Sequence, residues 1–222
     1  MRLHTHKIKK LLLVVCIPCI ISCTKNVSTT PSNAFITVIN KTNSLASITI
    51  NGKKFMVDEN QNPLYTYYYM QVSAGSNSFT LLDWNTKKAV FDTNFVFLKD
   101  TYYTVVVYDS AQTVKTILIK DILPKPVRHK SYFRLLNLDR DAEQCTLSNK
   151  KGDVLSYTGI MSNLKEATSF NDIPSSANYS IAVPLKNGSN LVNDYMYSEV
   201  TDDITTILIY KHDVFTHDHF KL

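Results

Sequence analysis

Apolar and polar residues alternate over many short stretches of the chain. The alternation is clearest at residues 47–51, 78–82, 91–97, 102–108 and 115–120. Because successive side chains of a strand point to opposite faces, a period of two predicts strands with one buried face. Turn-forming residues separate these runs. About seven short strands in roughly 90 residues is typical of a β-sandwich, so we predict an all-β fold.

The same pattern of strands occurs twice along the chain. Four pairs of segments match in the same order, at spacings of 97 to 102 residues: 35–40 with 132–137, 47–50 with 144–147, 72–75 with 173–176, and 104–108 with 206–210. One such match could arise by chance, but four in order predict a tandem repeat.

A segment with two prolines separates the two copies. We predict a first β-sandwich at residues 33–123, a linker at 124–130 (PKPVRHK) and a second β-sandwich at 131–222. The prolines should make the linker semi-rigid, and each copy should bury a core of its own. Neither copy carries the cysteine pair around a core tryptophan of antibody domains,. The prediction is therefore two tandem Ig-like β-sandwich domains, in architecture only.

The first 22 residues have the order of a secretory signal peptide. Four basic residues precede an apolar run at residues 11–21, which is followed by Ser22 and Cys23,. This order resembles a bacterial lipoprotein signal, whose peptidase cuts before a lipid-modified cysteine. We predict a signal peptide at residues 1–22, acylation of Cys23, and a polar tether at 23–32. Secretion without lipid and an uncleaved anchor are the alternatives, although the apolar run is shorter than the roughly 20 residues of a membrane-spanning helix.

The predicted anchor also predicts a location. A lipid on Cys23 would hold the protein at the bacterial outer membrane. Residues 24–27 (TKNV) contain no acidic residue, and exported surface lipoproteins often carry acidic residues there. We therefore slightly favour the periplasmic face over the cell surface.

Removal of the signal peptide changes the charge of the protein. The whole chain has a formal net charge of +5, and the signal peptide holds four basic and no acidic residues, which leaves 5 − 4 = +1. Such a chain has no net electrostatic attraction to nucleic acid. Only Cys23 and Cys145 remain in the mature chain, so an acylated Cys23 excludes an intrachain disulfide. Cys145 lies in an alternating stretch and is predicted to be a buried, unreactive thiol.

Several of these segments resemble a known family. They are residues 133–142 (FRLLNLDRDA), 165–170 (KEATSF), 72–75 (VSAG) and 102–106 (YYTVV). They are similar to the domain of unknown function 4397, common in lipoproteins of the Bacteroidota, over nearly all of residues 33–222. Asp139-Arg140 replaces the family's Ser-Pro, and residues 41–44 lack the pattern, which indicates a divergent member. The resemblance implies tandem Ig-like sandwiches at the cell envelope and brings no established activity or catalytic residues.

The C-terminal residues 212–219 (HDVFTHDH) are the strongest polar cluster in the sequence. On a strand, His217 and His219 project from the same face, so with another ligand such as His212 they could bind zinc or copper. The alternative is that these histidines line the solvent-facing side of the last strand.

Tyrosines provide a second candidate site. Tyr65, Tyr67, Tyr68 and Tyr69 are close together in the sequence, and exposed tyrosines offer large contact areas to sugars or proteins. Core packing of an alternating subset is the alternative.

A candidate modification site lies at residues 109–111. Asp109-Ser110-Ala111 resembles the Asp-Ser/Thr-apolar acceptor of O-glycosylation in the same bacterial group, which would make Ser110 the modified residue. An ordinary hairpin turn, in which Asp109 bonds its own backbone, is the alternative.

Two classes of function fit these observations. The first is a non-catalytic envelope module that binds a glycan or a protein, or serves as a scaffold. The second is an enzyme with a loop-assembled site or a histidine-based metal site. No linear motif for a nucleophile, a phosphate loop or a zinc hydrolase is present in the mature chain,. We therefore favour the first class and predict no cofactor and no nucleic-acid partner.

Overall fold

The computed structural model describes residues 32–42, 46–55, 69–83, 85–111, 113–158, 169–176, 178–196 and 204–219. The predicted signal peptide, Cys23 and all of the predicted tether except Ser32 lie outside these residues. Pro31–Leu222 form one compact unit. Every named element is a strand, which confirms the all-β prediction. The described part of the chain contains no helix with the length and apolar character needed to cross a membrane.

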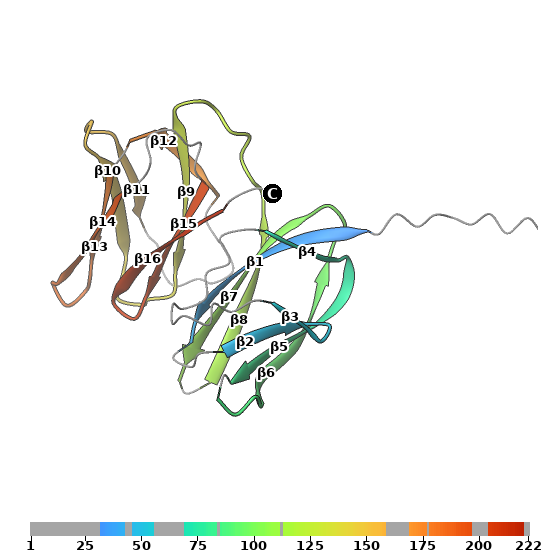
Figure 1. Ribbon diagram of the computed structural model, residues 1–222. Helices are drawn as coiled ribbons and strands as arrows, with labels where there is room; N and C mark the ends of the chain where they lie inside the picture. The colour runs from blue at the N-terminus through green and yellow to red at the C-terminus, as the bar shows by residue number, and fades with distance from the viewer. Residues whose placement is uncertain are drawn as a thin grey trace, which may run out of the picture. The chain divides into compact units, whose positions relative to one another are not determined.

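The described residues form sixteen strands, whose arrangement is drawn in Figure 1. The first eight are β1 (Asn33–Lys41), β2 (Ala46–Ile50), β3 (Lys53–Phe55), β4 (Met70–Ser73), β5 (Gly75–Asp83), β6 (Ala89–Phe97), β7 (Tyr102–Ser110) and β8 (Thr113–Asp121). The last eight are β9 (Lys130–Asn137), β10 (Gln144–Asn149), β11 (Val154–Thr158), β12 (Asn171–Pro174), β13 (Asn178–Pro184), β14 (Asn190–Met196), β15 (Ile204–Tyr210) and β16 (Asp213–Asp218).

These strands form four sheets with a repeated topology. The first eight strands form sheets of order β4-β1-β7-β8 and β3-β2-β5-β6. The last eight form sheets of order β12-β9-β15-β16 and β11-β10-β13-β14, so each strand of the first half has its counterpart eight strands later. The two parallel pairs, β1 with β7 and β9 with β15, are also equivalent. The fold is therefore two β-sandwiches in tandem.

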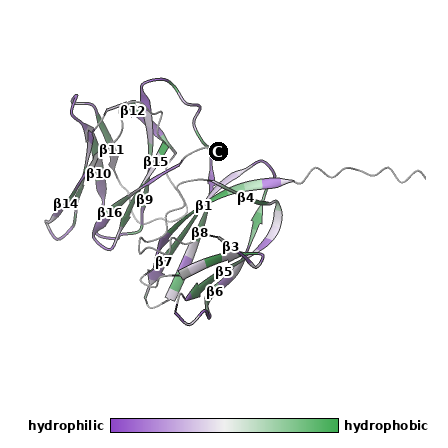
Figure 2. Ribbon diagram, viewed as in Figure 1, coloured by the Kyte–Doolittle hydropathy of each residue, from purple (hydrophilic) through white to green (hydrophobic). Residues whose placement is uncertain are grey.

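Each sandwich encloses its own apolar core between its two sheets. The core of the first contains Ile36, Phe79 and Val105, and the core of the second contains Phe133, Ile181 and Ile207. In the sheets β3-β2-β5-β6 and β11-β10-β13-β14, which we call the outer sheets, burial alternates along the strands as the sequence predicts. Strand β13, for example, buries every second residue. Figure 2 shows the resulting hydrophobic positions along β1 and β15.

A third apolar cluster joins the two sandwiches. It combines residues from the sheet β4-β1-β7-β8 with residues from the sheet β12-β9-β15-β16: Ile39, Val106, Tyr108, Ile119, Leu136, Leu208 and Tyr210. The Tyr210 hydroxyl donates a 2.7 Å hydrogen bond to the carbonyl of Asp109, across this interface. These two sheets therefore each pack against a core on one face and against the other sandwich on the opposite face.

Burial on both faces is visible in the central strands. All seven residues of β15 are buried, and β7 has six consecutive buried residues. Parallel strands buried on both faces are typically continuous apolar runs, and the segments TVVVY and TTILIY fit this rule,. The alternation that we predicted for residues 102–108 is therefore absent from the burial of β7, because the neighbouring sandwich covers its second face.

Polar side chains occupy one part of the interface between the sandwiches, around Arg134. Arg134 is 2% exposed. Its Nη1 atom lies 2.5 Å from Oδ1 of Asp121, while Nε donates to the Thr206 hydroxyl at 2.8 Å and Nη2 to the Thr104 hydroxyl at 2.7 Å. Its guanidinium carbon also lies 4.7 Å from the centre of the Phe170 ring, a cation–π geometry,.

Asp121 accepts two further hydrogen bonds in this interface. The hydroxyls of Tyr69 and Thr104 both donate to its Oδ2 at 2.7 Å. Asp121 and Arg134 belong to different sandwiches, so a buried ion pair with its hydrogen bonds satisfied links the two halves. A buried charge is costly unless it is paired in this way.

Asp121→Asn should destabilise the protein by about 3–5 kcal/mol, because it leaves the buried Arg134 charge without a counter-charge. Urea unfolding monitored by circular dichroism measures this change. The double variant Asp121→Asn with Arg134→Met should recover part of the loss.

The matched control is Asp172→Asn, which removes an ion pair with Lys130 whose two side chains are 44% and 47% exposed. This change should have a much smaller effect, since solvent screens exposed pairs. An Asp121→Asn protein as stable as the Asp172→Asn protein would contradict the assigned role of the pair.

Candidate functional site

The C-terminal histidines lie inside the interface between the sandwiches. His217 and His219 are 1% and 4% exposed, so the alternative that they line a solvent-facing side of the last strand is wrong. They do share one face, as predicted, with ring centres 4.9 Å apart. Their Nε2 atoms lie 2.9 Å from the Thr37 hydroxyl and 2.6 Å from the Thr206 hydroxyl, respectively. The predicted partner His212 lies elsewhere.

Burial and positive neighbours keep these two imidazoles neutral. The pKa of His217 is lowered to about 3, mainly by desolvation and then by the positive charges of Arg134 and Lys41. Desolvation also lowers the pKa of His219 well below its usual value, with His217 and Arg134 contributing. The negative charge of Asp121 in this cluster already pairs with Arg134.

Tyr69 also belongs to the interface and not to an exposed patch. It is 1% exposed, its hydroxyl bonds Asp121, and its ring stacks on His219 with the centres 5.5 Å apart. Burial, and then the negative charge of Asp121, raise the pKa of Tyr69. The prediction of an exposed binding platform is therefore wrong for Tyr69. Tyr65, Tyr67 and Tyr68 lie outside the described residues.

His212 groups with two aspartates on the rim of the second sandwich. Its Nε2 lies 3.0 Å from Oδ2 of Asp141 and 3.7 Å from Oδ2 of Asp139. Asp139 also accepts a 2.6 Å hydrogen bond from the His212 backbone. These three side chains could hold a metal ion, but the hydrogen bonds between them already account for their arrangement. Metal binding by the histidines stays a prediction.

Two further sequence predictions have a defined place in the structure. Cys145 is fully buried, and burial raises the pKa of its thiol to about 12, which confirms the buried thiol. Ser110 is the last residue of β7 and pairs with Thr113, so the turn begins two residues later than predicted. Its side chain is half-buried. Glycosylation of Ser110 stays a prediction.

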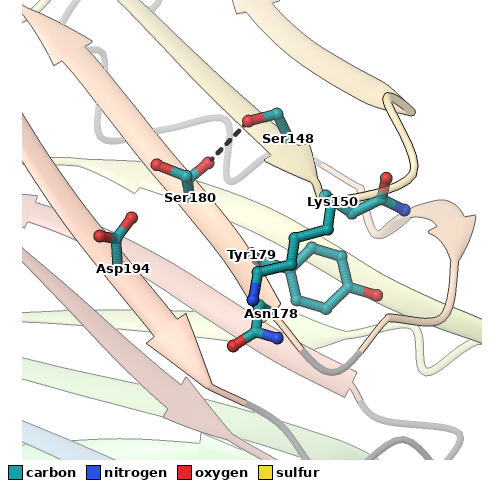
Figure 3. Close-up of a pocket in the computed structure, with 7 residues that line it drawn as sticks. Ser148, Lys150, Asn178, Tyr179, Ser180 and Asp194 are labelled. Carbon is teal, nitrogen blue, oxygen red and sulfur yellow. Dashed lines mark hydrogen bonds between the residues drawn. The ribbon is translucent and has the colours of Figure 1, made fainter.

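The second sandwich carries an open hollow on its outer sheet, away from the interface residues. Its volume is about 370 Å³, and its lining includes Ser148 of β10, Asn178 and Ser180 of β13, and Asp194 of β14. Lys150, which directly follows β10, completes this polar lining (Figure 3). We call this hollow the β13 hollow.

The register of the sheet explains how these side chains come together. Ser148 pairs with Ser180, and Ser180 pairs with Asp194, so the three form one row across neighbouring strands. Neighbouring strands lie about 4.8 Å apart, which spaces the side chains along the row by a similar distance. The small serines in the middle leave the space, and the exposed Lys150 and Asp194 lie at its rim.

Sequence reasoning missed this hollow. The sequence feature that could have indicated it is the occurrence of serine, asparagine and aspartate at the outward-facing positions of strands whose residues alternate in burial. This is also the ordinary composition of a solvated sheet face. Only the register brings Ser148, Ser180 and Asp194 into one row.

Acidification should destabilise the protein through the buried histidines. The unfolded chain protonates its histidines near pH 6.5, whereas folded His217 resists protonation down to about pH 3,. The neutral imidazole therefore contributes its full stability above pH 6.5 and loses it as the pH falls toward 3. At pH 5 we expect a loss of about 2 kcal/mol from His217 relative to pH 7.

Urea unfolding of His217→Gln at both pH values isolates this contribution from that of the carboxylates. The difference in stability between pH 7 and pH 5 should be about 2 kcal/mol smaller in this variant than in the native protein. His212→Gln, at a half-exposed position, is the matched control. If His212→Gln changed the pH dependence as much as His217→Gln, the buried imidazole would not be its cause.

Comparison with solved structures finds distant similarity to carbohydrate-binding modules. A family 26 module from Eubacterium rectale Amy13K, crystallised with maltoheptaose, shares 12% identity over 83% of this chain and 96% of that chain, with a TM-score of 0.24. A structure of family 41 modules from streptococcal virulence factors, described for α-glucan recognition, shares 9% identity over 84% and 97%, with a TM-score of 0.30. These scores are too low to support a conclusion about ligand.

Comparison with curated proteins finds no match. A family model does match the chain, over residues 34–147. The match begins in β1, crosses the whole first sandwich and ends in β10. It covers just over half of the 222 residues. The resemblance seen in the sequence is therefore confirmed over residues 34–147, and the chain belongs to the family described as Domain of unknown function (DUF4397).

Proposed function

We propose that the protein is a non-catalytic binding module and that its ligand is a glycan, held in the β13 hollow. The observation that carries the proposal is the row Ser148–Ser180–Asp194 with Lys150 beside it. Hydroxyl, carboxylate and ammonium groups together donate and accept hydrogen bonds, as sugar hydroxyls require. The hollow is open, so it could hold one segment of a longer chain.

The placement of the perturbed groups supports binding over catalysis. Strongly shifted pKa values mark candidate catalytic residues when they occur in a cleft. Here the large shifts belong to buried groups: Lys41, Tyr69, Cys145, Tyr157, His217 and His219. These side chains lie in the core or in the interface between the sandwiches, where their role is structural.

We further propose that a lipid on Cys23 anchors the module to the outer membrane, with the periplasmic face slightly favoured. The apolar run that ends at Ser22-Cys23 supports this. The polar residues 24–32 would then separate the first sandwich from the membrane by up to about 30 Å. The anchor would hold a binding module near envelope polysaccharides or an envelope protein.

Ser180→Tyr should weaken glycan binding strongly, because a large ring at the centre of the row fills the β13 hollow. The probes are soluble polygalacturonate, which is acidic, and dextran, which is neutral, each titrated by isothermal calorimetry. We expect the affinity for the bound polysaccharide to fall at least 10-fold, about 1.4 kcal/mol.

The matched control is Ser156→Tyr, on the outer face of β11 in the same sheet, at an exposed position that does not line the hollow. This variant should bind as the native protein does. Equal binding by Ser180→Tyr and Ser156→Tyr would place the ligand elsewhere.

Cys23→Ala should leave the chain as an unlipidated precursor, because Cys16 and Cys19 follow valine and proline, which are poor residues before the cut. Incorporation of labelled palmitate in growing cells measures this. Continued labelling of the variant would show that Cys23 is not the acylated residue.

A further inference from the structure

One end of the first sandwich is the end at which the chain enters it. The start of β1, the end of β4, the loop between β6 and β7 and the end of β8 all lie there. The backbone N–H of Ala74 donates to the carbonyl of Ser32 at 2.8 Å, and that of Asp100 donates to the carbonyl of Asn33 at 2.8 Å. The predicted tether therefore joins the sandwich directly beside these loops.

The turn between β2 and β3 places Lys53 near the same end. Asn51 and the glycine after it have positive φ angles of 50° and 73°, as a tight two-residue turn requires,. The Asn51 amide donates to Oδ1 of Asn77 at 2.7 Å, and the Asn77 amide donates to the carbonyl of Ser73 at 2.9 Å. Lys53 and Asn33 line one polar hollow of about 260 Å³. The amide contacts thus fix a lysine beside the point of chain entry.

Positive charge predominates in the turn and in the neighbouring loop. The charged residues of segments 51–54 and 98–101 are three lysines and one aspartate: Lys53, Lys54, Lys99 and Asp100. All three lysines are exposed. Asp100 lies 3.9 Å from Lys99 and offsets one of the three charges. The net charge of +1 for the mature chain therefore hides a basic end.

Two large apolar side chains are exposed at this basic end. Leu98 and Ile122 are 55% and 83% exposed. Leu98 directly follows β6, and Ile122 directly follows β8. Apolar side chains next to cations suit the surface of a membrane, where the first enter the boundary of the acyl chains and the second attract anionic headgroups. We call the following residues the entry face: Lys53, Lys54, Leu98, Lys99 and Ile122.

We infer that the entry face docks onto the surface of a bilayer that contains anionic phospholipids. This inference rests on the proposed lipid anchor, which brings the face to the membrane. The lysines attract headgroups only within about a Debye length, about 10 Å, whereas the extended tether would reach about 30 Å. Because the tether joins the sandwich at the entry face, a folded tether brings these lysines within that range.

Docking would fix the orientation of the module at the membrane. Two net positive charges give weak attraction by themselves, at roughly 5-fold in affinity for each lysine near an anionic surface. The anchor makes weak attraction sufficient, because a short tether keeps the face at a high effective concentration near the headgroups. The opposite end of the first sandwich would then point away from the bilayer.

The experiment uses the lipid-bearing protein, purified in detergent and reconstituted on vesicles of phosphatidylglycerol or of phosphatidylcholine. A nitrobenzoxadiazole label on Ser73→Cys, at the exposed end of β4, reports contact with the bilayer through its emission wavelength. Cys145 is fully buried and should not react, and an acylated Cys23 has no free thiol. The control label is on Val90→Cys, near the opposite end of the sandwich. Seven residues of β5 separate the two ends, about 24 Å.

We expect the emission of the Ser73→Cys label to shift to shorter wavelength on phosphatidylglycerol and not on phosphatidylcholine. The Val90→Cys label should emit as in water on both. Added salt of about 0.5 M should reverse the shift, because it screens the lysines.

The combined change Lys53→Glu and Lys99→Glu should abolish the shift. The matched control is Lys88→Glu with Lys115→Glu, which makes the same change in charge at exposed positions near the opposite end and should keep the shift. The same response from both variants would overturn the docking.

Flotation of the vesicles separates this proposal from the anchor. Protein that floats with both kinds of vesicle, with a Ser73→Cys label that never shifts or shifts equally on both, would overturn the docking and leave the anchor standing. Protein that floats only with phosphatidylglycerol and shows the shift would overturn the anchor and leave the docking standing. Protein that floats with neither would overturn both.

Discussion

The buried ion pair of Arg134 and Asp121 constrains the rest of the structure. Two charges removed from water must meet at close range and satisfy their remaining hydrogen bonds, or their desolvation outweighs their attraction. Thr104, Thr206 and Tyr69 supply those bonds, and they come from three separate segments of the chain. The ion pair therefore fixes how the two central sheets face each other. The apolar cluster beside it adds area to this interface but has no comparable directional requirement.

The residues that the two sandwiches contribute to this interface occupy equivalent positions of the repeat, but the residue types differ. Arg134 is the equivalent of Thr37, 97 residues earlier. Asp121 pairs with Tyr102, and His219 bonds the backbone of Ile204, the equivalent of Tyr102, so Asp121 and His219 also correspond. An arginine at both equivalent positions would bring excess positive charge into a dry interface. The observed divergence gives one cation, one anion and two neutral imidazoles, which favours pairing of unlike halves over pairing of like halves.

The sequence predicts the strands of this fold better than it predicts what packs against each face of them. Alternation and repetition located the strands, and the apolar context of Cys145 indicated its burial. The interface was missed because a sequence shows the period of a strand and not what covers each face. Its signal was present in the continuous apolar segments of β7 and β15. The sequence predicts a binding platform or core packing for Tyr69, and a metal site or a solvent-facing strand for His217 and His219, because polar groups usually lie at the surface. Their burial depends on hydroxyl and carboxylate partners distant in the sequence, and the β13 hollow depends on strand register.

The parallel pairing of β1 with β7 also has a consequence for the order of folding. Phe35 pairs with Tyr102, and Ile39 with Val106. The first strand therefore cannot complete its pairing until β7, almost 70 residues later in the chain, has been synthesised. Such non-local pairing slows folding, because the loop must close before its contacts contribute. The sheet that results still exposes Val106 and Tyr108 until the second repeat covers them. During synthesis, the first sandwich is therefore an aggregation-prone intermediate. Its exposed apolar residues are protected only when the second sandwich folds against them.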